Sequence, residues 1–106
     1  MKEYAVRITE RARRDMEAIY DHIAKRLLAP ETAQRQYDRI ASEILSLRTF
    51  PARCPLLESK PERSLGMRRL LIDNYSVFYV VSEDAVTVLR VLYSASDLLN
   101  RLRSGT

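Results

Sequence analysis

The first 28 residues change from a strand-like to a helix-like distribution of apolar positions. Over residues 3–9 apolar and polar side chains alternate, which is typical of a half-buried strand. From position 10 to about 28 the apolar positions recur at helical spacing and form one stripe. Thr9 stands where an N-cap is needed. We therefore expect a short strand that leads directly into an amphipathic helix.

A second helix is predicted to begin at Pro30, because proline suits the first turn of a helix. Apolar residues repeat the helical stripe from there until Phe50-Pro51 ends it. The connection between the two helices, Leu28-Ala29, is very short. Two helices joined in this way must pack as an antiparallel hairpin.

The second half of the chain reads as a loop followed by strands. Residues 49–65 hold three of the four prolines and show no periodicity, so we expect a long loop of the kind that is functional or mobile. Runs rich in β-branched and aromatic residues follow at 67–72, 75–82 and 86–93. They predict three sequential antiparallel strands. The third is apolar on both faces, which indicates a central strand covered on both sides.

A short helix over residues 97–103, capped by Ser96, is the last predicted element. The fold class is therefore α+β, with an N-terminal strand, an antiparallel two-helix hairpin, a three-stranded antiparallel meander that completes one sheet, and a short C-terminal helix. A chain of 106 residues is about the size of one domain, so we expect residues 1–106 to form a single domain.

Composition places the chain among globular cytoplasmic proteins. Hydrophobic residues make up 46% and charged residues 30%, and no apolar run is long enough to span a membrane. The N-terminus carries charges where a signal peptide needs an apolar core. Cys54 is the single cysteine, and neither a disulfide nor a metal site is expected. We expect no cofactor.

The net charge of +4 favours an acidic partner without identifying it. Only three of the 18 basic residues are lysine, and guanidinium groups suit phosphate and carboxylate better than ammonium groups do. The basic residues are scattered along the chain, so any basic patch must be assembled by the fold.

Common catalytic motifs are not found in the sequence. It has no glycine-rich phosphate loop and no metal-ligand spacing. The one histidine, His22, lies on the first predicted helix. We expect it to have a surface or packing role remote from the strands, so the chain lacks the usual general base at neutral pH.

Arginine and tyrosine are the unusual residues of the predicted strands. Arg68 and Arg69 must face opposite sides, because strand side chains alternate. Arg90 interrupts an apolar strand. It either pairs with Asp97 or a helix carboxylate, or lies on an open face where a ligand meets it.

Three tyrosines, Tyr75, Tyr79 and Tyr93, are expected to be core aromatics with one bonded hydroxyl rather than catalytic phenols.

Several phrases, in this order and spacing, resemble the RelE/ParE superfamily of toxins. The phrases are Thr9 followed by ARRDMEAIYDHI at 12–23, Leu47 with Phe50-Pro51, Gly66-Met67-Arg68, NYSVFYVV at 74–81 and VLRVLYSASDLL at 88–99. The resemblance spans nearly the whole chain. It implies the toxin of a bacterial type II toxin–antitoxin system, held inactive by a cognate antitoxin and reaching operator DNA only through that antitoxin.

The superfamily has two activities, and the resemblance favours one of them. RelE-like members cut messenger RNA on the ribosome, and ParE-like members inhibit DNA gyrase. The strand arginine of the nuclease branch corresponds to Ser76 here, and the arginine after the last strand corresponds to Ser96. The phrase RVLYSASD resembles the ParE pattern more, although Tyr93 stands where histidine is frequent. A ParE-like inhibitor of gyrase that acts by binding is therefore preferred.

Two alternatives stay open, so whether the chain is an enzyme is not decided by the sequence. They are a RelE-like ribonuclease, for which Arg68, Arg69 and Tyr93 are the catalytic candidates, and a general nucleic-acid-binding module. The residues predicted to bind the target or the antitoxin are Arg68, Arg69, Arg90, Tyr93, Asp97, Arg101 and Arg103.

Overall fold

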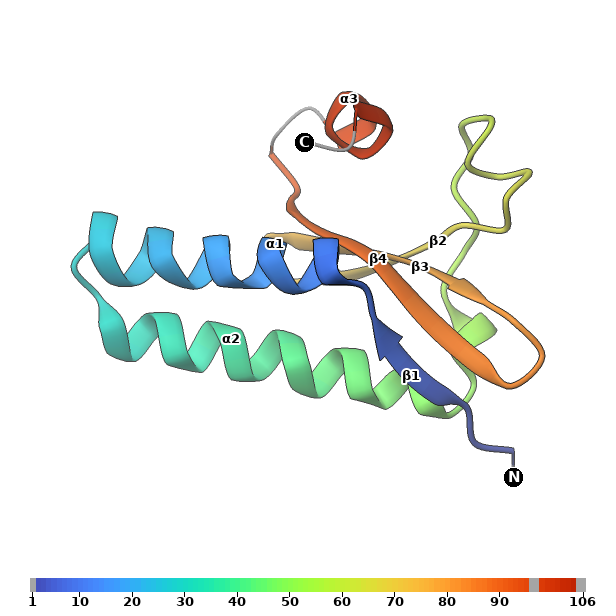
Figure 1. Ribbon diagram of the computed structural model, residues 1–106, viewed down its shortest axis with the longest axis horizontal. Helices are drawn as coiled ribbons and strands as arrows, with labels where there is room; N and C mark the ends of the chain where they lie inside the picture. The colour runs from blue at the N-terminus through green and yellow to red at the C-terminus, as the bar shows by residue number, and fades with distance from the viewer. Residues whose placement is uncertain (1, 96–97, 105–106) are drawn as a thin grey trace.

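The computed structural model describes residues 2–95 and 98–104. One sheet has the strand order β1-β4-β3-β2, with β1 parallel to β4 and the other neighbours antiparallel. Helices α1 and α2 cover one side of this sheet, and α3 lies on the other side (Figure 1). The elements are β1 (Ala5–Ile8), α1 (Glu10–Asp21), α2 (Pro30–Leu45), β2 (Arg68–Ile72), β3 (Tyr75–Val81), β4 (Ala85–Tyr93) and α3 (Leu98–Ser104). The predicted α+β architecture is confirmed.

The helical hairpin begins as predicted and turns differently at its tip. The Thr9 hydroxyl accepts the Ala12 N–H at 3.1 Å and caps α1. The α-helix then ends at Asp21, and a π-helical turn (His22–Arg26) follows, where the sequence predicted one helix to about position 28. Leu28 has a φ of 53°, a left-handed conformation that ends the helix and lets Pro30 begin α2.

The main core lies between the hairpin and the sheet. It combines residues of α1, of α2 and of the 3₁₀ turn that follows α2 (Ser46–Arg48) with the hairpin-facing side of the strands. These residues are Ala12, Met16, Ile40, Ile44, Leu47, Val77, Tyr79, Val86, Val88 and Val91. A smaller cluster of Met67, Phe78 and Leu92 lies on the opposite face, where Leu98 and Leu102 of α3 pack against it. The central strand β4 is thus covered on both sides, as its apolar pattern predicted.

The segment predicted as a long loop is anchored at several points. A 3₁₀ turn (Pro51–Arg53) follows α2, and the Tyr79 hydroxyl donates to the Pro51 carbonyl at 2.6 Å. Burial raises the pKa of Tyr79, which stays a hydrogen-bond donor. Within the described residues, no helix is both long and apolar enough to cross a membrane.

Candidate functional site

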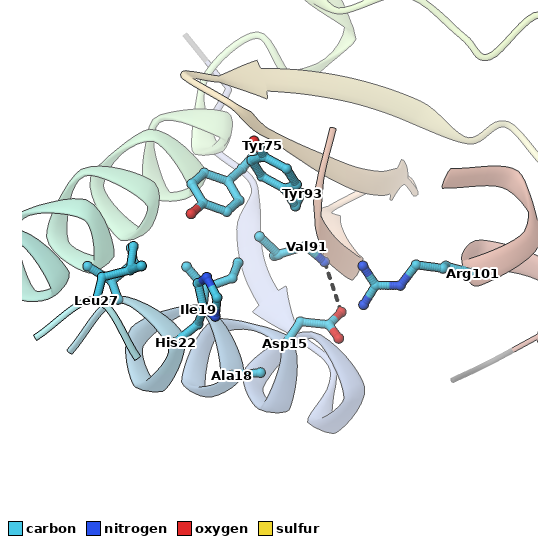
Figure 2. A pocket seen from close by; sticks show the side chains of 10 residues that line it. Asp15, Ala18, Ile19, His22, Leu27, Tyr75, Val91, Tyr93 and Arg101 are labelled. Atoms are coloured by element: carbon cyan, nitrogen blue, oxygen red, sulfur yellow. Dashed lines mark hydrogen bonds between the residues drawn. The ribbon is translucent and has the colours of Figure 1, made fainter. Parts of the chain in front are cut away.

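The edge of β4 beyond the end of β1 is covered by residues of α1 and its cap. The pairing of β1 with β4 ends at Ile8 and Val88. The next carbonyl, that of Leu89, accepts the Thr9 hydroxyl at 3.2 Å. The Val91 N–H then donates to Asp15 Oδ2 at 3.0 Å (Figure 2). The first half of α1 therefore completes an edge that a longer β1 would otherwise pair.

Asp15 also binds the buried arginine of β4. Arg90 Nε lies 2.7 Å from Asp15 Oδ2, and Arg90 Nη2 lies 3.0 Å from Asp15 Oδ1. These two side chains are only 6% and 11% exposed. The expectation that a helix carboxylate pairs with Arg90 is confirmed, and the other expected partner, Asp97, lies outside the described residues. Because Arg90 is buried, it supports a binding surface from beneath and does not form part of that surface.

A groove of about 470 Å³ opens beside this ion pair, between α1 and the ends of β3 and β4. We call it the tyrosine groove. Apolar side chains make its floor, and the polar side chains of Asp15, His22 and Arg101 stand around them (Figure 2). The lining residues are Asp15, Ala18, Ile19, His22, Ile23, Leu27, Tyr75, Val91, Tyr93 and Arg101.

Two tyrosine rings form one wall of this groove. Tyr75 and Tyr93 meet edge to face, with ring centroids 5.7 Å apart. Tyr93 is 46% exposed, so the expectation of a core aromatic is wrong for this residue, whose ring ends the sheet at the surface. Burial raises the pKa of Tyr75, with Tyr93 and Asp73 adding to the effect. The Tyr75 phenol is therefore protonated at neutral pH.

The expectation that His22 is remote from the strands is wrong. Its ring lines the tyrosine groove together with Asp15 and Tyr93, because α1 runs along the end of β4 (Figure 2). Asp15, Ile19 and His22 are separated by four and three residues, which places them on one helix face. This helical spacing is the signal that would have joined Asp15 and His22 in one predicted site.

Arg68 and Arg69 contact different parts of the molecule, as strand alternation predicted. Arg68 Nη1 donates to the Cys54 carbonyl at 2.6 Å and holds the segment after α2. Arg69 Nε donates to Ser76 Oγ at 2.9 Å, and Ser76 Oγ lies 2.8 Å from Ser94 Oγ. Both arginines therefore have partners that fix the fold.

Arg103 binds α3 to the loop that precedes β2. Arg103 Nε lies 2.9 Å from Glu62 Oε2, and Arg103 Nη2 lies 3.0 Å from both Glu62 Oε1 and the Lys60 carbonyl. Glu62 is 3% exposed. Arg103 and then Ser59 stabilise its charged form and lower the pKa of Glu62 to about 2.

The six described residues of the predicted binding set thus do not share one surface. Tyr93 and Arg101 line the tyrosine groove, and Arg90 supports it through Asp15 and through the Arg101 carbonyl at 3.1 Å. The other described arginines of the set lie elsewhere. Over residues 2–95 and 98–104, no three His, Cys, Asp or Glu side chains are placed to hold a metal ion. What the groove offers is an apolar, aromatic surface with charged groups at one end.

A two-helix hairpin on one face of a β1-β4-β3-β2 sheet, with a short helix on the other face, is the architecture of RelE/ParE-type toxins. The family model described as the ParE toxin of the type II toxin-antitoxin system, parDE, matches residues 6–98. The chain belongs to this family.

Two solved structures show the same fold. The chromosomal ParDE toxin–antitoxin system from P. aeruginosa contains a chain with a TM-score of 0.72 and 24% identity, and the match covers 86% of this chain and 96% of that one. The RelBE2 toxin–antitoxin complex from Mycobacterium tuberculosis gives a TM-score of 0.64 and 22% identity, with 91% and 97% covered. A search of curated protein sequences gave no significant match.

Proposed function

We propose that this chain is a ParE-like toxin that inhibits DNA gyrase by binding and is neutralised by a cognate antitoxin. The observation that carries the proposal is the match of the ParE toxin family model to residues 6–98. The fold is shared by both branches of the superfamily, so the choice between binding and RNA cleavage rests on the family match and on the chemistry of the site.

The exposed apolar residues around the tyrosine groove support a binding function. Tyr93 is 46% exposed and Leu27 is 61% exposed, and both line the groove. Leu28, at the tip of the hairpin, is 83% exposed. Large apolar side chains gathered at one surface, with charged groups beside them, are typical of a protein interaction site.

The residues at the positions of the nuclease arginines also support binding over RNA cleavage. RNA cleavage through the ribose hydroxyl needs a base, an acid and cations around the phosphate. Ser76 stands at one of these positions, fully buried and bonded to Arg69 and Ser94. The face that would hold the phosphate is therefore occupied by internal hydrogen bonds.

A ribosome-dependent ribonuclease is the second candidate, and one observation favours it. His22, Tyr93 and Arg101 line one groove, which brings an imidazole, a phenol and a guanidinium together. These are the groups that proton transfer and phosphate stabilisation use. The groove therefore has to be tested for both activities.

Two substitutions of Tyr93 separate binding from proton transfer. Binding needs the ring, so Tyr93→Ala should weaken inhibition of gyrase supercoiling about tenfold or more, and Tyr93→Phe should weaken it much less. The assays are gyrase supercoiling and ribosome-programmed RNA cleavage, with pulse-labelling of DNA, RNA and protein synthesis after induction. Codon-specific cuts in the ribosomal A site, lost equally with Phe and Ala while supercoiling is unaffected, would establish the ribonuclease instead.

The antitoxin part of the proposal is tested by co-expression with the adjacent reading frame. A segment that wraps this domain and folds on binding typically buries about 1,000–3,000 Å². We expect the two products to elute together in size-exclusion chromatography at micromolar concentration. Separate elution would refute the antitoxin hypothesis for that gene product.

A further inference from the structure

Three arginines near the start of α1 have no partner within the described chain. Arg7 lies in β1, and Arg11 and Arg14 lie in the first half of α1. Arg7 and Arg14 are exposed, and Arg11 is half-buried. Among residues 2–95 and 98–104, no group forms a hydrogen bond or an ion pair with any of these three guanidinium groups. Their charges are therefore available to a ligand.

These three arginines lie on one side of the molecule. Val6 packs into the main core, so the alternation of strand side chains turns Arg7 to the opposite face, which also carries α3 (Figure 1). Arg11 precedes Asp15 by four residues and so lies on the side of α1 that meets β4. Arg14 follows Arg11 by three residues and is its neighbour on the helix surface. We call these three arginines the α1 basic surface.

The carboxylates in the first half of α1 already have arginine partners. Arg13 forms ion pairs with both Glu10 and Glu17, on the outer side of the helix. Arg13, and at longer range Arg14, lower the pKa of Glu10. Asp15 is bound by the buried arginine of β4. The positive charge of the α1 basic surface is therefore not cancelled by the helix that carries it.

We propose that the α1 basic surface binds the phosphate backbone of duplex DNA. Planar guanidinium groups match the oxygens of phosphate and bind them with two hydrogen bonds. A protein partner would instead need an apolar centre with charges at its rim. The exposed apolar residues Leu27, Leu28 and Tyr93 lie at the hairpin tip and the tyrosine groove. Ile8 is 43% exposed, but strand alternation places it on the face opposite to Arg7.

This DNA contact rests on the proposed function and extends it. Gyrase acts on DNA, so an inhibitor bound to gyrase lies beside a duplex. Asp15 lines the tyrosine groove and lies one helical turn beyond Arg11, so a protein-binding groove and a phosphate-binding surface are adjacent. Contacts to phosphate carry no sequence information. We therefore expect the chain to bind duplexes of different sequence equally well.

The salt dependence of DNA binding measures the contact. The probe is a short fluorescent duplex, and its anisotropy is followed as the purified full chain is added at several salt concentrations. Three phosphate contacts predict a slope of about −2.7 for log K against log salt concentration. Combining Arg11→Gln with Arg14→Gln should change the slope to about −0.9 and weaken binding at low salt at least about tenfold. Combining Arg11→Lys with Arg14→Lys keeps both charges and should keep the slope.

The matched control combines Arg26→Gln with Arg35→Gln. Both are exposed arginines of the helical hairpin, so the control loses the same net charge away from the α1 basic surface. Its slope should stay at about −2.7. Equal affinity and slope for the two glutamine pairs would overturn the proposal, because net charge alone would then attract the DNA. If the Arg11 and Arg14 pair of glutamines does not fold, the unaltered chain decides: a slope of about −2.7 supports the proposal and a slope near zero overturns it.

Two further probes test other ligands of the same surface. A single-stranded RNA of equal length that binds more tightly than the duplex, and loses this affinity with the Arg11 and Arg14 pair of glutamines, would overturn the choice of DNA. If the unaltered chain does not bind the duplex and the same pair abolishes binding of the protein encoded by the adjacent reading frame, the surface belongs to that protein and the proposal fails. A gyrase supercoiling assay separates the proposed function: DNA binding as predicted without inhibition of gyrase would refute the function and leave the DNA contact.

Discussion

Two edges of the same sheet are completed in different ways. On β4, beyond the end of β1, the chain supplies its own partners, because Thr9 binds the Leu89 carbonyl and Asp15 binds the Val91 N–H. On β2 the cover formed by residues 55–57 ends at Arg69, and Leu71 is left facing solvent. An edge completed from within the chain contributes to stability, whereas an open edge is available to a partner.

The side chain that completes the β4 edge also neutralises a buried charge. One carboxylate, that of Asp15, accepts both from the Arg90 guanidinium and from the Val91 N–H. A buried arginine without such a partner would carry an uncompensated charge. The pair therefore fixes α1 against β4 and forms one end of the tyrosine groove.

The largest expected effect follows from breaking this pair. Asp15→Ala leaves Arg90 buried without its carboxylate and Val91 without its acceptor, so we expect a loss of about 3–5 kcal/mol in the free energy of unfolding. Urea denaturation measures it. Arg90→Ala should also lower stability clearly, and an unchanged melting point with abolished toxicity would instead make Arg90 a functional contact.

The control for Asp15→Ala is Asp21→Ala on the same helix. Asp21 Oδ1 lies 3.5 Å from Lys25 Nζ, and both side chains are more than half exposed. Exposed pairs of this kind contribute little, so we expect a change within about 0.5 kcal/mol. If the two substitutions cost the same, the β4 edge is not completed in the way described above.

The sequence predicted the features of the fold that depend on the local pattern of apolar and polar residues. Strand and hairpin positions follow from the spacing of apolar residues, so they were found within a few residues. The partner of Arg90 was predicted only as a class, because Asp15 lies 75 residues away in the chain and the pairing depends on where α1 crosses β4. The same crossing places His22 and Tyr93 in one groove, which the local pattern of neither the helix nor the strand predicts.

A smaller effect is expected at the contact between α3 and the loop before β2, because Arg103 is about half exposed. The folded-state pKa of Glu62 is about 2, below its usual 4.5. Its ionised form therefore adds stability that is present above about pH 4.5 and is lost as pH falls towards 2.

Glu62→Gln should accordingly be less stable than the unaltered chain at pH 7, and the difference should disappear near pH 2. Denaturation at a series of pH values measures this. Glu58→Gln is the matched control, because Glu58 lies in the same loop and is exposed. A Glu62→Gln effect that is independent of pH would show that lost packing, not charge, is responsible.

The next smaller loss of stability is expected when Thr9, the N-cap of α1 at the start of the β4 edge, is replaced. Thr9→Ala removes the acceptor of the Ala12 N–H and the donor to the Leu89 carbonyl, so we expect a loss of about 1 kcal/mol. Thr32→Ala, at an exposed position in the first turn of α2, is the control and should be close to neutral. Equal melting temperatures for the two variants would mean that Thr9 adds nothing to this edge.

The smallest effect is expected at the open edge itself. In the free chain the Leu71 N–H and C=O have no partner among the described residues and the side chain is 60% exposed, so there is little for a substitution to remove. Leu71→Thr places a β-branched residue, which suits a strand, at this position and should change the free energy of unfolding by less than about 0.5 kcal/mol. Urea denaturation of the free chain and of its antitoxin complex measures both states. If this residue matters only to a partner, the variant should lower the stability of the complex while leaving the free chain unchanged. A loss of 2 kcal/mol or more in the free chain, roughly the size expected of a buried leucine, would show that Leu71 is part of the core and that the two edges do not differ as described.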